Sequence, residues 1–183
     1  LLKHKGLFYG LGTLGRSSVG FVASSWLLYF YMPPESSPLV PVALYGVAIL
    51  GGRLVSALIT PYIGYFSDMS RNRFGRRLPF MFVAAIFFLI AFALLWRPPL
   101  ENESLVNWVY LFSIVIIFRL STSLHQVPSQ ALLPELAEDD NERVRLSTWD
   151  AAFLLIGMMW GGMAGIFIEK YGFQGMSKIY ILS

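Results

Sequence analysis

Long apolar stretches, separated by short polar connections, make up most of this chain of 183 residues. The stretches cover residues 6–32, 40–67, 79–96, 105–133 and 148–168, and a sixth begins near Met176. Each of the first five has the roughly 18–20 residues that a helix needs to cross about 30 Å of hydrocarbon. They do not alternate between polar and apolar positions as the strands of a membrane barrel would. The pattern therefore predicts an all-α, polytopic membrane helix bundle, with residues 1–183 forming a single transmembrane domain.

Composition supports this interpretation. Hydrophobic residues make up 56% of the chain and charged residues 14%, whereas about a quarter of the residues in a soluble domain are charged. The chain contains no cysteine, which excludes disulfides and thiolate metal sites. The sequence also lacks a nucleophile–base set, a cluster of metal ligands and a phosphate-binding or dinucleotide-binding glycine pattern. We therefore expect no enzyme activity, no cofactor and no metal site.

The basic residues predict how the chain crosses the membrane. With a cytoplasmic N-terminus, eight of them fall on the cytoplasmic side and three on the outer side: Lys3, Lys5, Arg71, Arg73, Arg76, Arg77, Arg143 and Arg145 against Arg97, Lys170 and Lys178. Basic connections stay on the cytoplasmic side of a membrane. We therefore expect an integral protein of the cell (inner) membrane with residues 33–39, 97–104 and 169–176 outside. The net charge of +3 reflects this orientation, and it does not indicate binding to nucleic acid.

The connection formed by residues 64–80, GYFSDMSRNRFGRRLPF, is the most informative short segment. Its characteristic positions are Gly64, Asp68, Gly75, Arg76 and Arg77. This pattern resembles the loop between the second and third helices of major facilitator superfamily transporters, in particular the melibiose-type sugar–cation symporters and the plant sucrose transporters. The resemblance implies a gating loop that steadies the outward-facing state. The alternative is an ordinary basic loop that only sets orientation.

The resemblance also predicts what surrounds the chain. Transporters of this superfamily have twelve helices in two related halves. The chain resembles an N-terminal half with five complete transmembrane helices and the start of a sixth. It begins at Leu1 and ends at Ser183 inside an apolar run, so both ends look cut. The expected partners are the lipid bilayer, a missing C-terminal six-helix half and a small-molecule solute, with other membrane subunits as a further option.

Three arginines lie within the apolar stretches, at Arg16, Arg53 and Arg119. An ionisable group at membrane depth costs at least about 2.5–3.5 kcal/mol and is usually retained for a function. Asp150 is the sole candidate counter-ion within the stretches. Either a partner half supplies further carboxylates, or an anionic or polyhydroxylated ligand balances the arginines. For Arg16, reaching the membrane surface with its long side chain is a third option.

Small residues recur at helical spacing in the first and fifth stretches. One face of the first stretch carries Gly10, Thr13, Ser17, Gly20 and Ser24. This face predicts either close helix packing or the wall of an aqueous cavity, and the neighbouring Arg16 favours the cavity. In the fifth stretch, glycines stand four residues apart at Gly157, Gly161 and Gly165. We interpret them as a surface for helix packing rather than a substrate site.

The first helix can be compared with the melibiose-type symporters position by position. Its segment YGLGTLGRSSVGF is similar to the family segment in which a Lys–Asp pair takes part in sugar binding. Arg16 matches the basic member of that pair, and Ser17 stands in place of the aspartate. The resemblance therefore assigns Arg16, Ser17 and Thr13 to substrate binding.

The second and fourth helices depart further from the family. The segment GRLVSALITPYIG resembles the one that carries cation-binding acids, but the chain has Ser56, Ile59 and Thr60 there. In HQVPSQALLPEL, Gln126 takes a position often held by a sugar-binding aspartate. Arg119 lies where plant sucrose transporters carry a protonatable aspartate. The coupling positions therefore lack acids, although the loop pattern is intact.

These observations favour a secondary active transporter that carries a sugar or a sugar acid by alternating access. The expected substrate-binding residues are Arg16, Ser17, Thr13, Arg53, Arg119, Gln126 and Asp150. The alternative is a transporter-derived membrane scaffold, assembly factor or subunit of a larger complex without transport activity. The missing acids favour the alternative, and the loop pattern favours the transporter.

Overall fold

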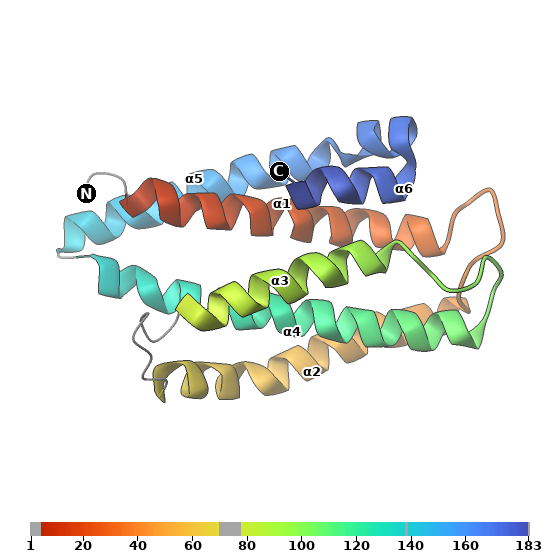
Figure 1. Cartoon of the computed structure of the whole chain (residues 1–183), viewed down its shortest axis with the longest axis horizontal. Helices are drawn as coiled ribbons and strands as arrows, with labels where there is room; N and C mark the ends of the chain where they lie inside the picture. Colours follow the sequence, from red (N-terminus) through yellow and green to blue (C-terminus); the bar gives the residue numbers. More distant parts are fainter. Residues whose placement is uncertain (1–4, 70–77, 138, 183) are drawn as a thin grey trace. The chain divides into compact units, whose positions relative to one another are not determined.

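The described residues, 5–69, 78–137 and 139–182, form six helices in this computed structural model. Figure 1 shows how the helices follow one another along the chain. In chain order they are α1 (Lys5–Tyr31), α2 (Val42–Met69), α3 (Leu78–Leu95), α4 (Leu105–Leu136), α5 (Asp140–Gly162) and α6 (Ala164–Leu182). The prediction of an all-α protein is confirmed.

The helices follow the apolar stretches of the sequence, with two clear differences. By length and composition, α2 and the Leu105–Pro134 part of α4 can each cross a membrane. The pair α5 and α6, bent by 62° at their junction, is a third candidate, and α3 contains the shorter apolar segment Phe80–Leu95. The first difference is that α5 begins at Asp140, well before the apolar stretch at 148–168. The second is that this stretch is broken after Gly162, so α6 begins at Ala164 and not near Met176. The expectation of five complete spans within one transmembrane domain stays a prediction.

The chain divides into two compact units. The first unit consists of the chain up to Trp26 together with the chain from Gln130 onward, and the second consists of Leu27–Ser129. The boundaries fall within α1 and α4. Most of α1 therefore groups with α5 and α6, whereas α2 and α3 group with most of α4.

In the first unit, α1 and α5 pack so closely that their contact requires glycine. A Cβ atom added at Gly157 would collide with the Ser17 Oγ atom and would lie 2.5 Å from the carbonyl oxygen of Leu14. At Gly161 it would lie 2.8 Å from the carbonyl oxygen of Ser18. Small residues allow this approach of two backbones in lipid. The interpretation as a packing surface is therefore confirmed for Gly157 and Gly161, whereas Gly165 lies in α6, where an added Cβ atom would lie 3.0 Å from the Trp26 ring.

The junction between α5 and α6 is held by aromatic residues. The Tyr180 hydroxyl of α6 donates to the carbonyl oxygen of Trp160 at 2.5 Å, near the end of α5. The rings of Trp160, Phe167 and Tyr180 lie with their centroids 5.7–6.0 Å apart. Between Phe167 and Tyr180 the chain turns at Gly172, whose φ of 68° favours glycine. The last part of α6 then runs in the opposite direction to α5 (Figure 1).

In the second unit, α4 packs against both α2 and α3. A Cβ atom added at Gly51 of α2 would lie 2.5 Å from the Phe112 ring of α4, and one at Gly52 would lie 2.6 Å from Val115. On the α3 side, the rings of Phe88 and Phe118 stack with centroids 5.0 Å apart. The centre of this unit is therefore the face of α4 that α2 and α3 share.

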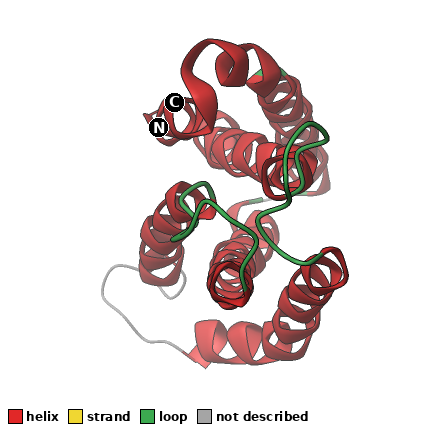
Figure 2. Ribbon diagram, turned by 90° about the vertical axis from the view of Figure 1, so that its right-hand side faces the viewer, coloured by secondary structure: helices red, strands yellow, loops and turns green. Residues whose placement is uncertain are grey.

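At one end of the second unit, Asn107 ties two connecting segments together. Its Nδ2 atom donates to the carbonyl oxygens of Leu39, Leu100 and Asn102 at 2.9–3.0 Å, and its Oδ1 atom accepts from the Leu100 amide at 3.0 Å. Asn107 is fully buried. The connections before α2 and before α4, drawn as green loops in Figure 2, therefore lie at the same end of this unit.

We expect Asn107→Ala to lower stability by at least about 2 kcal/mol, because several buried backbone groups would lose their partner. The midpoint of thermal unfolding in detergent, followed by tryptophan fluorescence, measures this effect. Asn102→Ala is the matched control, since the Asn102 side chain is exposed. Equal unfolding midpoints for the two variants would contradict the role of Asn107.

We expect Gly157→Ala to destabilise the α1–α5 contact by about 1–3 kcal/mol, the usual cost of overpacking. The same unfolding measurement tests this. Gly162→Ala is the control on the same helix, because a Cβ atom there meets no described atom within 4 Å. If the Gly157→Ala and Gly162→Ala proteins were equally stable, the α1–α5 contact would not require glycine at position 157, and the prediction would be wrong.

Candidate functional site

In the first unit, the contact between α1 and α5 carries a hydrogen bond between two polar side chains. The Thr13 hydroxyl of α1 donates to the Asp150 Oδ1 atom of α5 at 2.5 Å. Thr13 is buried, with 3% of its surface exposed, and Asp150 is half-buried. One turn before Thr13, a Cβ atom at Gly10 would collide with the Phe153 ring, so the backbones are close here as well. The carboxylate is therefore held against α1.

Arg16 lies near this hydrogen bond. Its guanidinium interacts electrostatically with Asp150 and with Tyr9. The Arg16 Nε atom is buried and has no hydrogen-bond partner in the described part of the chain. Asp150 thus provides a nearby negative charge, and the guanidinium keeps unused donor capacity. The structure places three predicted site residues, Thr13, Arg16 and Asp150, in one polar cluster.

Ser17 was expected to bind substrate, but its hydroxyl is bonded within its own helix. Its hydroxyl donates to the carbonyl oxygen of Leu14 in the same helix at 3.0 Å. The residue is buried, and it faces Gly157 of α5. In this conformation the Ser17 hydroxyl lies in the helix contact. Its assignment to substrate binding stays a prediction.

The second unit brings Arg53 of α2 and Arg119 of α4 near each other. Each charge acts on the other. The side chain of Arg119 runs along Gly52, where an added Cβ atom would lie 3.6 Å from its Cγ atom. Among the described residues, no carboxylate forms an ion pair with either guanidinium. Two positive charges from neighbouring helices therefore stand together without a balancing acid in the described part of the chain.

Hydroxyl groups lie one helical turn beyond the two arginines. The Ser56 and Ser123 hydroxyls are 2.7 Å apart and join α2 to α4. The Thr60 hydroxyl donates to the carbonyl oxygen of Ser56 at 2.7 Å, and Ile59 is partly exposed. The expected coupling positions Ser56, Ile59 and Thr60 thus carry no acid, and Ser56 is hydrogen-bonded to Ser123.

The other predicted residues of the substrate site and the gating loop have less distinctive surroundings. Gln126 is half-buried on α4, beside His125. Asp68 is exposed near the end of α2. A Cβ atom at Gly64 would meet Val127 at 3.8 Å, an ordinary contact, so the helices here do not require glycine. Gly75, Arg76 and Arg77 of the expected gating loop lie outside the described residues.

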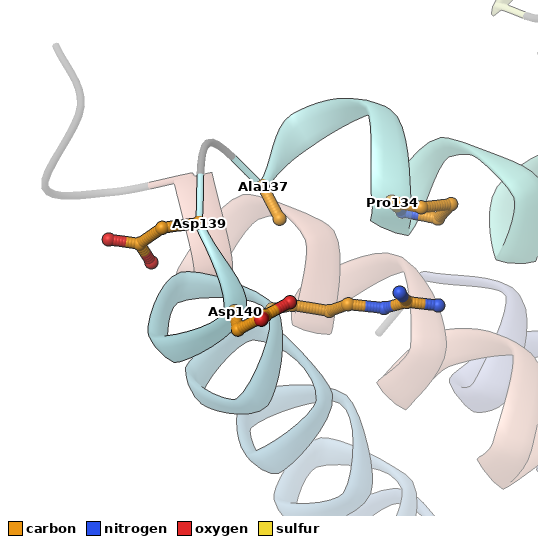
Figure 3. Close-up of a pocket in the computed structure, with 5 residues that line it drawn as sticks. Pro134, Ala137, Asp139 and Asp140 are labelled. Carbon is orange, nitrogen blue, oxygen red and sulfur yellow. The ribbon is translucent and has the colours of Figure 1, made fainter.

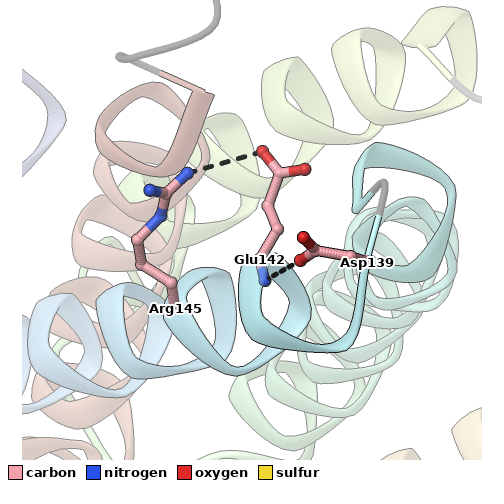
Figure 4. A network of polar contacts seen from close by, with 3 residues as sticks. All are labelled: Asp139, Glu142 and Arg145. Atoms are coloured by element: carbon pink, nitrogen blue, oxygen red, sulfur yellow. Dashed lines mark hydrogen bonds and ion pairs between the residues drawn. The ribbon is translucent and has the colours of Figure 1, made fainter.

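The start of α5 holds features that the sequence interpretation missed. Asp139 caps the helix, its Oδ1 atom accepting from the Glu142 amide at 2.6 Å, and Glu142 pairs with Arg145 at 3.5 Å (Figure 4). A surface hollow of about 390 Å³ lies beside this cap, lined by Pro134, Ala137, Asp139, Asp140 and Arg143 (Figure 3). The cap has a sequence signal, an aspartate followed three residues later by a glutamate.

The predicted site is divided between the two units. Thr13, Arg16, Ser17 and Asp150 belong to the first unit, and Arg53, Arg119 and Gln126 belong to the second. Each set has its own geometry, with a carboxylate–hydroxyl–guanidinium cluster in the first and a pair of guanidiniums beside a pair of hydroxyls in the second. That the two sets face a common solute stays a prediction.

Comparison with known proteins gives a consistent picture. Residues 8–169 match the family model described as MFS/sugar transport protein. An uncharacterised symporter of Synechocystis is 33% identical over 82% of this chain and 28% of its own length. A sucrose transport protein of Arabidopsis thaliana is 26% identical over 77% of the chain and 28% of its own length. An isoprimeverose transporter of Lactiplantibacillus pentosus is 28% identical over 69% of the chain and 26% of its own length. The chain thus spans less than a third of each of these relatives.

Proposed function

Because the chain belongs to the family of MFS/sugar transport proteins, we propose that the protein is a secondary active transporter working by alternating access. Membership of this transporter family confirms the expectations of an integral membrane protein and of a protein that is not an enzyme. The observation that carries the proposal is the pair of arginines at Arg53 and Arg119. Charges within membrane helices are costly, and they usually mark a path for a solute or an ion.

We propose that the solute is a sugar acid. Arg53 and Arg119 repel each other in the absence of an anion, and a carboxylate between them would remove that repulsion. Guanidinium groups suit a carboxylate because they can donate two parallel hydrogen bonds to it. A neutral sugar would leave both charges unbalanced.

The neighbouring hydroxyls fit the rest of such a solute. Ser56 follows Arg53 by three residues, and Ser123 follows Arg119 by four, so on each helix the hydroxyl and the guanidinium share a face. The Ser56–Ser123 pair can exchange its mutual hydrogen bond for bonds to sugar hydroxyls. In this proposal Thr13, Arg16, Ser17, Gln126 and Asp150 remain further substrate-binding candidates.

The orientation and the gating loop are also proposals. Basic residues favour a cytoplasmic N-terminus in the cell (inner) membrane. The Asn107 contacts hold two connections at the same end of the second unit, as a common side of the membrane for both connections requires. We propose that Asp68 at the end of α2 takes part in gating with the loop that follows it.

Binding of glucuronate and glucose to the purified protein tests the solute class. We expect tighter binding of glucuronate, and a loss of at least about tenfold in Arg119→Gln, because a charge-assisted hydrogen bond contributes about 1.5–3 kcal/mol. Arg119→Lys should recover only part of the affinity, since lysine keeps the charge but not the paired donors. Arg97→Gln is the control, because Arg97 is exposed outside the predicted spans.

A preference for glucose that Arg119→Gln leaves intact would contradict the sugar-acid proposal. Binding of neither sugar by folded protein would favour the alternative of a membrane scaffold without transport activity.

Single cysteines test the orientation, since the natural chain has none. In intact cells, we expect an impermeant thiol reagent to label Ser36→Cys and to leave Ser70→Cys unlabelled until the membrane is permeabilised. The reverse result would show that the N-terminus is outside.

A further inference from the structure

In the second unit, α2 and α4 run side by side in the same direction, as Figure 1 shows. Their contact is closest near the middle of α2. A Cβ atom added at Gly52 would lie 2.6 Å from Val115, and one turn further the Ser56 and Ser123 hydroxyls are 2.7 Å apart. Because these contacts follow one another in the same order along both helices, the serine pair links two parallel helices.

A proline follows the serine by five residues in both helices. Pro61 lies inside α2, and Pro128 lies inside α4 and is fully buried. Proline has no N–H group, so the carbonyl group four residues earlier loses its usual helical donor, and the ring crowds the same carbonyl. Sharp bends in helices occur mostly at proline. Each helix therefore has a bending point about 7.5 Å beyond the serine pair, at about 1.5 Å per residue.

The part of α4 that precedes its proline is held by several contacts. Phe118 stacks on Phe88 of α3, and Asn107 binds three carbonyl oxygens of the neighbouring connections. Nearer the prolines the contact between α2 and α4 is ordinary, because a Cβ atom at Gly64 would lie 3.8 Å from Val127. The beginnings of the two helices are therefore fixed more firmly than their ends.

The two helices also continue for the same length beyond their prolines. α2 ends at Met69 and α4 ends at Leu136, in each case eight residues after the proline. Eight helical residues form an arm of about 12 Å. A bend of about 20° at each proline would move each end sideways by about 4 Å, so the two ends would separate by about 8 Å.

We propose that Ser56, Pro61, Ser123 and Pro128 form an α2–α4 gate, in which the serine pair holds the ends of the helices together and the prolines allow them to part. The control of this gate by the solute rests on the proposed transport of a sugar acid. In that proposal, sugar hydroxyls replace the bond between the serines. The solute then binds the separated state more tightly than the closed one, and this difference shifts the population toward separation. In the proposed orientation both ends lie on the cytoplasmic side, so separation opens the site toward the cytoplasm.

A purely structural role does not account for this arrangement. Prolines are tolerated in membrane helices where other groups satisfy the freed carbonyl, and a hydroxyl pair can hold two helices together. Neither role requires a proline at the same distance from the serine pair in both helices, followed by arms of the same length. A gate does, because both ends must leave the contact together.

Distances between spin labels at Met69→Cys and Leu136→Cys test the α2–α4 gate, since residues 1–183 contain no cysteine. Pulsed electron paramagnetic resonance measures them on the full-length protein in liposomes, with any cysteine outside these residues replaced. Without solute we expect mainly the shorter distance, and glucuronate should add a distance longer by about 8 Å. Pro61→Ala should remove about half of this increase, and Pro61→Ala with Pro128→Ala should remove nearly all of it. Pro61 is exposed, so its substitution leaves no cavity and serves where Pro128→Ala does not fold.

Further substitutions separate the parts of the gate. Pro134→Ala changes a proline of the same helix only two residues before the label at position 136, so it should alter the distance by no more than about 1 Å. Ser56→Ala removes the bond to Ser123 and should raise the ratio of separated to closed protein about two- to tenfold without solute, the usual effect of one hydrogen bond. Ser113→Ala removes a bond within α4 alone and should leave this ratio unchanged.

The results distinguish a wrong gate from a wrong solute. If the longer distance appears in Ser56→Ala but not with glucuronate, the α2–α4 gate stands and the proposed solute is wrong. A single distance under all conditions, Ser56→Ala included, would overturn the gate. A longer distance that both proline substitutions leave unchanged would also overturn it, because the bending points would then lie elsewhere. If glucuronate lengthens the distance and Ser56→Ala does not, the serine pair does not hold the gate closed and the inference is wrong.

Discussion

Close contact between helix backbones is the constraint on which the rest of this structure depends. Apolar side chains gain little by leaving lipid for one another, so membrane helices associate where small residues permit close approach. In the first unit that condition is met where Gly157 and Gly161 of α5 meet α1. In the second it is met where Gly51 and Gly52 of α2 meet α4. Both units therefore use the same physical solution with different helices.

The glycine contacts also set where polar groups can meet. Thr13 reaches Asp150 because Gly10 and Gly157, above and below it along the helices, bring α1 and α5 together. The short serine side chains at Ser56 and Ser123 can bond each other only because Gly52 lets α4 approach α2 one turn away. The polar chemistry of each unit therefore depends on its packing, and a change at a glycine would alter both.

Much of the fold could be predicted from the sequence, because apolar runs and glycine spacing are local signals. The helical class and the packing role of Gly157 and Gly161 are confirmed. The early start of α5 was missed, because a search for apolar runs finds only the part of a helix that suits lipid. The cap at Asp139 marks the true start, and its local pattern is readable. The hydrogen bonds of Asn107 were missed for another reason: they join segments far apart in the chain, and one asparagine in an apolar run gives no sign of its partners.

The candidate site shows the same limit. Sequence reasoning selected Thr13, Arg16 and Asp150 separately, but whether two residues on different helices touch depends on the rotation and depth of each helix. The structure supplies that information for the first unit, and it changes the role of Asp150 from a general counter-ion to a specific partner of Thr13. Within the predicted spans, Asp150 is one acid against the three arginines Arg16, Arg53 and Arg119. This distribution leaves an excess of positive charge within the predicted spans, and such an excess favours an anion over a cation.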